Sequence, residues 1–161
     1  MPANIDVFWS FRSPYSYLIT PDLLRLRADF DVTVSLRPVL PIAVRDKASV
    51  FDASDKKRPR YIVMDSLRRA ELLGLPMVWP KPDPVVQDRE TFEVPEDQPL
   101  IWRITGLGVE AERRGKGIDF ASAAAALIWG GTRDWHEGDH LAQAAAQVSL
   151  DLSDMEAAIQ E

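Results

Sequence analysis

Apolar and polar side chains alternate in two short stretches near the start of the chain. Residues 4–11 combine β-branched and aromatic side chains with a period of about two, and residues 32–39 alternate in the same way. Between them, apolar residues recur at helical spacing: Leu18, Ile19, Leu23, Leu24 and Leu26. A strand, a helix of about 15 residues and a second strand form a βαβ unit, whose two strands pair in parallel.

The residues around the first strand–helix junction predict where that helix begins. Ser13 suits the N-cap and Pro14 the first helical position, where a missing N–H costs nothing. Pro21 lies inside the helical pattern, so we expect it to kink or divide the helix.

The rest of the chain is predicted to be almost entirely helical. Residues 41–59 read as irregular and polar, and residues 61–73 form a helix that ends at Gly74 and is followed by Pro76. Six prolines predict an extended loop over residues 76–99. Further helices are expected at 100–114, 118–129, 138–148 and 153–161, with a turn at 114–117 between the first two.

Composition narrows the possible functions. The 161 residues include no cysteine, which excludes disulfides, thiolate nucleophiles and dithiol redox chemistry. The net charge of −6 disfavours a broad nucleic-acid surface. No apolar run is long enough to span a membrane, and the first residues lack the pattern of a signal peptide. We therefore expect a soluble cytoplasmic protein that acts on a small molecule or another protein, with no nucleic-acid or membrane partner.

The sequence Ser13-Pro14-Tyr15-Ser16 is the best candidate for a functional site. It lies beyond the carboxyl end of a parallel strand, where α/β folds bind ligands. The helix N-terminus offers unpaired amides that favour an anion, and a serine hydroxyl there can lower the pKa of a bound thiol. The alternative is that Ser13 only caps the helix.

Residues 7–18, Val-Phe-Trp-Ser-Phe-Arg-Ser-Pro-Tyr-Ser-Tyr-Leu, resemble the opening of two related families. These are the kappa-class glutathione transferases and the 2-hydroxychromene-2-carboxylate isomerases, which share a thioredoxin-like fold with DsbA-type disulfide oxidoreductases. The oxidoreductases carry Cys-Pro-X-Cys at this place, where Ser13 and Ser16 stand here. Residues 60–80 and 127–134 resemble further parts of the same families.

The resemblance implies an α/β, thioredoxin-like fold interrupted by a helical domain. Residues 1–55 would then be the N-terminal half of the thioredoxin-like domain and residues 56–161 the helical insertion. In these families a strand with a cis-proline turn, another strand and a final helix follow the insertion. That part has no counterpart in the 161 residues, so we expect the chain to be a fragment of a longer product. The families also carry an asparagine in the loop before the insertion, and residues 51–57 contain none.

The resemblance also implies an activity. It suggests a glutathione-dependent isomerase in which Ser13 stabilises the glutathione thiolate, while Pro14, Tyr15 and Arg12 help to form the binding site. The substrate would be an aromatic or unsaturated acid, and the protein a homodimer, as relatives usually are. Alternatives are a kappa-type glutathione transferase and a non-catalytic thioredoxin-like binding protein.

Three other features have competing interpretations. His136-Glu137-Gly138-Asp139-His140 matches the zinc-protease pattern His-Glu-x-x-His, but Gly138 favours a turn leading into a helix, and we expect no metal. The basic segment 56–60 either contacts an anionic ligand or forms a solvated surface. Four aromatic residues either line a substrate pocket or, for at least two of them, pack in the core: Tyr61, Trp79, Trp102 and Trp129.

Overall fold

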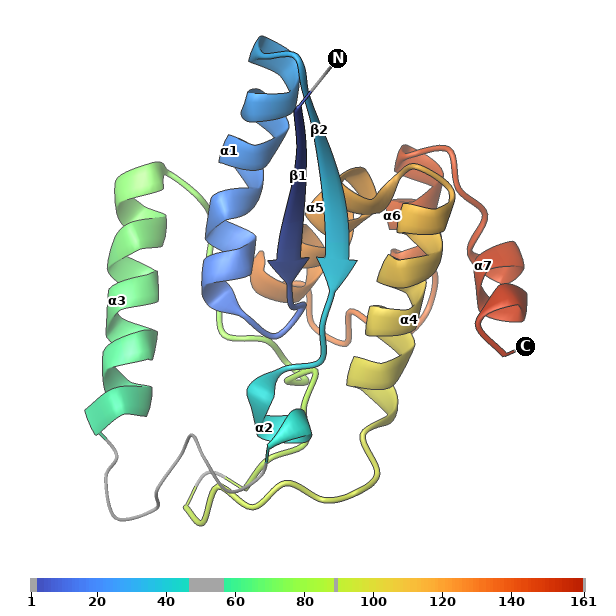
Figure 1. Ribbon diagram of the computed structural model, residues 1–161. Helices are drawn as coiled ribbons and strands as arrows, with labels where there is room; N and C mark the ends of the chain where they lie inside the picture. Colours follow the sequence, from blue (N-terminus) through green and yellow to red (C-terminus); the bar gives the residue numbers. More distant parts are fainter. Residues whose placement is uncertain (1–2, 47–56, 89, 161) are drawn as a thin grey trace.

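The computed structural model describes residues 3–46, 57–88 and 90–160 and begins with the predicted βαβ unit. Strand β1 (Ala3–Trp9), helix α1 (Pro14–Asp29) and strand β2 (Val32–Pro38) follow one another. The strands pair in parallel in a register that aligns Ala3 with Val32 and Trp9 with Pro38. Figure 1 shows the two strands side by side with α1 next to them. The prediction of a parallel pair joined by a helix is confirmed.

The two faces of this small sheet differ in chemistry. Trp9, Val34 and Leu36 are buried on the face that packs into the core, where α4 and α5 contact β2. The opposite face carries polar cross-strand pairs, because Arg37 binds Asp6 and the Ser35 hydroxyl donates to the Asn4 side chain at 2.8 Å. Burial of a single face therefore fixes the register of the strands.

Helix α1 runs without interruption from Pro14 to Asp29, so Pro21 does not divide the helix, and of the two predicted effects only a kink stays a prediction. A proline in a helix removes one backbone hydrogen bond. The rest of α1 compensates, since Tyr17 and Leu18 are buried and the helix packs along α5. Tertiary packing thus outweighs the local preference to break.

The remaining helices follow the predicted order with one addition. The short helix α2 (Ile42–Arg45) lies in a segment predicted to be irregular, and α3 begins before residue 61, at Lys57. The others are α3 (Lys57–Leu73), α4 (Pro99–Arg113), α5 (Gly117–Trp129), α6 (His140–Gln147) and α7 (Leu152–Ala158). No strand or helix occurs in the described part of the loop 76–98.

Gly74 ends helix α3 as predicted. Its φ of +66° lies in the left-handed region, which glycine adopts without a steric penalty. The amides of Gly74 and Leu75 donate to the carbonyls of Glu71 and Ala70, at 3.1 and 2.9 Å. These are the two hydrogen bonds of a Schellman motif.

One hydrophobic core joins the βαβ unit to the later helices. Phe11, fully buried after β1, packs edge-on against Trp9 with ring centroids 4.5 Å apart and lies 6.4 Å from the Phe120 ring. Ile104 of α4 and Ile128 of α5 belong to the same core. The predicted boundary between residues 1–55 and 56–161 falls outside the described residues and stays a prediction. No described helix combines the length and the apolar character needed to cross a membrane.

Candidate functional site

The tight turn between β1 and α1 presents Ser13 at the start of the helix. The Ser13 amide donates to the Ser10 carbonyl at 3.0 Å, which closes the turn. The Ser13 hydroxyl accepts a hydrogen bond from the Ser16 amide at 3.2 Å, so it caps α1 as predicted. In that role the oxygen acts as an acceptor, and the hydroxyl proton remains available to a ligand.

Two tryptophans of the core hold this turn in place. The indole N–H of Trp9 donates to the Ser16 carbonyl at 2.9 Å. The indole N–H of Trp129, on α5, donates to the Phe11 carbonyl at 3.1 Å. Both rings are buried, so the backbone on either side of Ser13 is fixed by side chains that the core itself immobilises.

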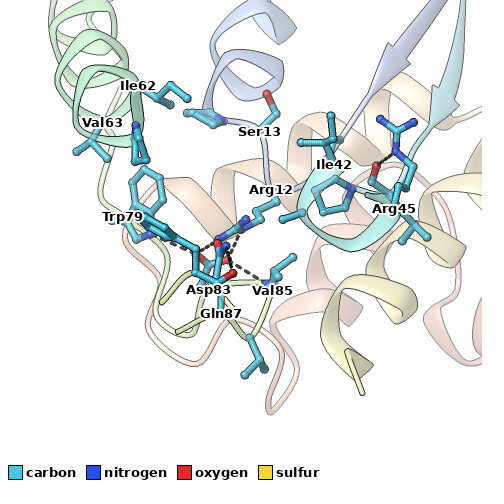
Figure 2. A pocket seen from close by; sticks show the side chains of 18 of the residues that line it. Arg12, Ser13, Ile42, Arg45, Ile62, Val63, Trp79, Asp83, Val85 and Gln87 are labelled. Atoms are coloured by element: carbon cyan, nitrogen blue, oxygen red, sulfur yellow. Dashed lines mark hydrogen bonds and ion pairs between the residues drawn. The ribbon is translucent and has the colours of Figure 1, made fainter. Parts of the chain in front are cut away.

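A cavity of about 880 Å³ opens at this end of α1. Figure 2 shows Ser13 above Arg12, with Trp79 on the left and Ile42 on the right. Its walls come from the β1–α1 turn, from residues 39–45, from α3 and from the loop 79–92. Most lining side chains are apolar: Pro14, Val39, Leu40, Pro41, Ile42, Ala43, Pro59, Ile62, Val63, Trp79, Pro82, Val85, Val86 and Phe92. The size and the apolar walls suit a small organic ligand.

All four residues predicted for the binding site line this one cavity. They are Arg12, Ser13, Pro14 and Tyr15. The structure therefore brings them together, while their roles toward a ligand stay predictions.

Hydrogen-bond donors without a partner gather where Ser13 meets the cavity. Within the described residues, the Tyr15 amide, at the second position of the helix, has no hydrogen-bond acceptor. The buried hydroxyl of Ser10, another lining residue, is likewise unpaired there. With the Ser13 hydroxyl and the positive end of the α1 dipole, the Tyr15 amide offers a place that favours an anion.

Arg12 points away from Ser13 and binds the loop 76–99. Its Nε donates to Asp83 Oδ1 at 2.9 Å, and its Nη2 donates to Gln87 Oε1 at 2.7 Å. Asp83 also accepts from the Trp79 indole at 3.3 Å and from the Val85 amide at 2.9 Å. A single carboxylate thus ties the residue before Ser13 to two points of the cavity wall (Figure 2).

Tyr15 joins α1 to α3 through its phenol. The hydroxyl donates to Asp65 Oδ2 at 2.8 Å, and Arg69 Nε donates to the same oxygen at 2.9 Å. Burial and the Asp65 carboxylate raise the pKa of Tyr15 to about 12. The hydrogen bonds from Tyr15 and Arg69 lower the pKa of Asp65. Tyr15 therefore stays protonated at neutral pH and works as a hydrogen-bond donor.

Asp83 and Gln87 are cavity residues that the sequence did not reveal. Both lie in a proline-rich loop without periodicity, and their partner Arg12 is more than seventy positions away. The only available signal was the polar side chains among prolines in this loop.

The histidine segment 136–140 and the basic segment 56–60 were the other candidates for a functional site. His136 lies in a turn, and His140 is the first residue of α6. This agrees with the prediction of a turn that leads into a helix. The described residues contain no group of three or more potential ligands placed to hold a metal ion. Arg58 and Arg60 are exposed at the start of α3, whereas Lys56 and the loop residues 51–55 lie outside the described residues.

The four aromatic residues take different positions. Trp129 is fully buried, and Trp79 packs against it with ring centroids 5.3 Å apart while lining the cavity. Trp102 and Tyr61 are 57% and 64% exposed. Two of the four thus pack in or on the core, and one of these also contributes to the cavity.

Comparison with known proteins assigns the family. The model of the DsbA-like thioredoxin domain matches residues 4–161. The chain belongs to this family. A solved structure of a 2-hydroxychromene-2-carboxylate isomerase superposes on this DsbA-like chain with a TM-score of 0.69 and 18% identity, covering 98% of this chain and 71% of the isomerase chain. At that identity the likeness establishes the fold. No curated protein matches the sequence.

The family assignment confirms the expected fold class. This DsbA-like chain has the α/β, thioredoxin-like start that the resemblance implied, followed by helices. Ser13 and Ser16 flank Pro14 and Tyr15 at the N-terminus of α1, so two hydroxyls stand where the resemblance places the cysteines of the oxidoreductases.

Proposed function

We propose that this DsbA-like protein is a glutathione-dependent isomerase of the 2-hydroxychromene-2-carboxylate isomerase type. The observation that carries the proposal is the placement of Ser13. It caps α1 and lines a largely apolar cavity, in a chain without cysteine. Such a site can bind a thiol but has no sulfur of its own, which favours a reaction that takes its nucleophile from glutathione.

The chain's own groups would stabilise a bound thiolate in three ways. The Ser13 hydroxyl donates a hydrogen bond, the unpaired Tyr15 amide donates a second, and the positive end of α1 favours the negative charge. Bound glutathione would supply the nucleophile, which adds to an electron-poor carbon of a conjugated double bond of the substrate and converts it into a single bond. Rotation about that single bond could follow, and re-formation of the double bond would expel glutathione unchanged. Pro14, which is buried between Ser13 and Tyr15, restricts the backbone that carries both donors.

The walls of the cavity favour an aromatic or unsaturated acid as substrate. Ile42, Val63 and Trp79 offer apolar surface for a flat ring. Arg45 and Lys81, which also line the cavity, form no ion pair with another described residue and are available to a carboxylate. A carboxylate on an apolar ring satisfies both parts of the site.

Calorimetric titration of glutathione into the protein and into Ser13→Ala tests the proposal. Ser13→Ala is expected to weaken glutathione binding at least about tenfold, because it removes a hydrogen bond to a charged group. The matched control is Asp151→Ala, which removes the side-chain cap of α7, where Asp151 accepts from the Asp154 amide at 2.9 Å. Loss of a cap alone lowers stability in both variants, whereas only Ser13→Ala should change affinity.

Two other functions make different predictions. A kappa-type transferase would leave a stable glutathione conjugate of an electrophile, whereas the isomerase returns free glutathione and an isomer of the acid. Mass spectrometry of products formed from a chromene-type acid separates these two activities. A non-catalytic thioredoxin-like binding protein predicts no glutathione binding in calorimetry, and that result would contradict both enzyme proposals.

The proposal extends to location and assembly. Reduced glutathione is abundant in the cytoplasm, so a glutathione-dependent reaction supports a cytoplasmic protein. A homodimer without nucleic-acid or membrane partners completes the proposal. Sedimentation of the protein at several concentrations tests the oligomeric state.

A further inference from the structure

We propose that Arg12 and Asp83 are positioning residues, which hold residues 79–88 as a wall of the cavity that Ser13 also lines. The Arg12 guanidinium would then bind the protein instead of the ligand. Only the effect of these residues on ligand affinity rests on the proposed function. Their effect on the order of the loop concerns the free protein and is tested separately.

Asp83 is the centre of one hydrogen-bond network in this wall. Its Oδ1 accepts from Arg12 Nε and from the Val85 amide, both at 2.9 Å. Its Oδ2 accepts from Arg12 Nη2 at 3.4 Å and from the Trp79 indole at 3.3 Å. Both oxygens are therefore surrounded by donors, an arrangement that an ionised carboxylate satisfies.

Arg12 extends the same network along the loop. Its Nη2 donates to Gln87 Oε1 at 2.7 Å, and Gln87 Nε2 in turn donates to the Phe92 carbonyl at 3.0 Å. The side chains of Arg12 and Asp83 are only 14% and 21% exposed, so their ion pair is shielded from water and salt. Arg12, Trp79, Asp83 and Gln87 all line the cavity, and the network thus forms part of its wall.

The chain offers no helix or strand to hold this loop. Residues 76–98 contain no helix or strand in the part that the structure describes, so separate hydrogen bonds hold the loop. The Val78 amide donates to the Trp129 carbonyl at 2.7 Å and the Asp134 amide donates to the Lys81 carbonyl at 2.8 Å, and the Arg12–Asp83 network adds side-chain contacts. Arg12 comes directly before Ser13, and its side chain therefore couples the position of the loop to the turn that presents the Ser13 hydroxyl. A guanidinium fork suits this role because two of its nitrogens reach two different acceptors.

Hydrogen exchange of the free protein, followed by mass spectrometry of peptides covering residues 79–92, tests the structural part. Asp83→Asn places an amide N–H₂ against donors and should raise exchange in this segment about tenfold or more. Arg12→Lys, which keeps the charge and loses the fork, should raise exchange to a similar extent, and the double variant should add little. Unchanged exchange in Asp83→Asn would overturn the proposal.

Asp119→Asn is the matched control. Asp119 on α5 binds Arg27 at the other end of α1, with Nη1–Oδ2 and Nη2–Oδ1 distances of 2.9 and 2.6 Å. This variant also breaks an arginine–carboxylate pair, but it should leave exchange over residues 79–92 unchanged. If it raises exchange there as much as Asp83→Asn does, the effect is global destabilisation and the proposal fails.

Ligand affinity separates a positioning role from direct binding. If Arg12 positions the wall, Asp83→Asn and Arg12→Lys should raise the KM for the acid substrate by similar factors, about tenfold, with a smaller change in kcat. If Arg12 binds a ligand anion, Arg12→Lys should retain much of the affinity and Asp83→Asn should not weaken it, which would overturn the proposal.

A milder variant covers the case in which Arg12→Lys and Asp83→Asn do not fold. Gln87→Ala removes two hydrogen bonds, the one from Arg12 and the one to the Phe92 carbonyl, and should raise exchange over residues 88–92 about threefold, while α5 stays protected. An unchanged exchange rate would contradict the proposal. Because these measurements need no glutathione, failure of the proposed isomerase activity would leave their outcome interpretable.

Discussion

A Cβ atom on Gly108 would lie 2.7 Å from Cε2 of Phe11. Helix α4 therefore crosses Phe11, two residues after the end of β1, at a distance that only glycine permits. The Phe11 ring has no free direction in which to move, since it is fully buried between Trp9 and Phe120. The close approach sets the position of α4 against the turn that carries Ser13.

Substitution of Gly108 by alanine should destabilise the protein by about 1–3 kcal/mol, because the methyl group forces the Phe11 ring or the helix to shift. The control is Gly106→Ala, two residues earlier in α4, where a Cβ would meet Ile159 Cδ1 at an ordinary 3.5 Å. At that position the better helix propensity of alanine should stabilise the protein by up to about 1 kcal/mol. Urea unfolding measures both; equal destabilisation would show that the Phe11 contact is unimportant.

Removal of the indole of Trp129 should weaken the turn before α1. Trp129→Phe leaves the Phe11 carbonyl without its hydrogen bond, and we expect a loss of about 1–3 kcal/mol. The control is Trp102→Phe, whose parent side chain is largely exposed and which should change stability by less than about 0.5 kcal/mol. Thermal or urea unfolding compares them.

Asp65→Asn should lower the pKa of Tyr15 from about 12 toward the ordinary value, although burial keeps part of the shift. Difference titration of tyrosinate absorbance against Tyr15→Phe measures the change. The internal control is Tyr17, whose pKa is raised by burial alone and should not respond. An unaltered Tyr15 titration would mean that Asp65 does not hold the phenol.

The same shift predicts how stability depends on alkaline pH. The folded protein keeps the Tyr15 proton at a pH where the unfolded chain releases it. The contribution of Tyr15 to stability is therefore complete below about pH 10 and is lost as the pH rises through about 12. The free energy of unfolding, measured at several alkaline pH values, should fall less steeply with pH in Asp65→Asn than in the parent protein.

The Arg27–Asp119 pair predicts an acid effect of opposite direction. The hydrogen bond from Arg27 lowers the pKa of Asp119, so its stabilisation is present above the ordinary aspartate pKa and is lost as the pH falls through the lowered value. Asp119→Asn should cost about 1 kcal/mol near pH 7, because the pair is only partly exposed. The cost should shrink as the pH falls through the lowered pKa of Asp119, because a protonated Asp119 is as uncharged as the asparagine that replaces it; a constant difference would contradict the assignment.

The sequence predicted most helices and both strands because their patterns depend on local spacing. Ser13 as cap, Pro14 at the first position of α1 and Gly74 after α3 follow from backbone geometry that neighbouring residues determine. The local pattern did not predict that α1 continues through Pro21, because the packing of α1 against α5 stabilises the continuous helix.

The candidate site was predictable only on one side. Arg12, Ser13, Pro14 and Tyr15 are adjacent in the chain, and the strand–helix junction indicated their place. The opposite wall depends on long-range hydrogen bonds to Asp83 and Gln87. No periodic pattern encodes these contacts, and only the folded structure brings the two sides together.

The hydrogen bonds of Trp9 and Trp129 to the backbone around Ser13 have a consequence for the entropy of binding. Both indoles belong to the core, so the conformational freedom of the turn is lost when the protein folds and not when a ligand arrives. A ligand therefore meets donors that are already oriented, and little of its binding energy is spent on ordering them. Ligand affinity at this end of α1 should accordingly persist up to the temperature at which the core itself melts.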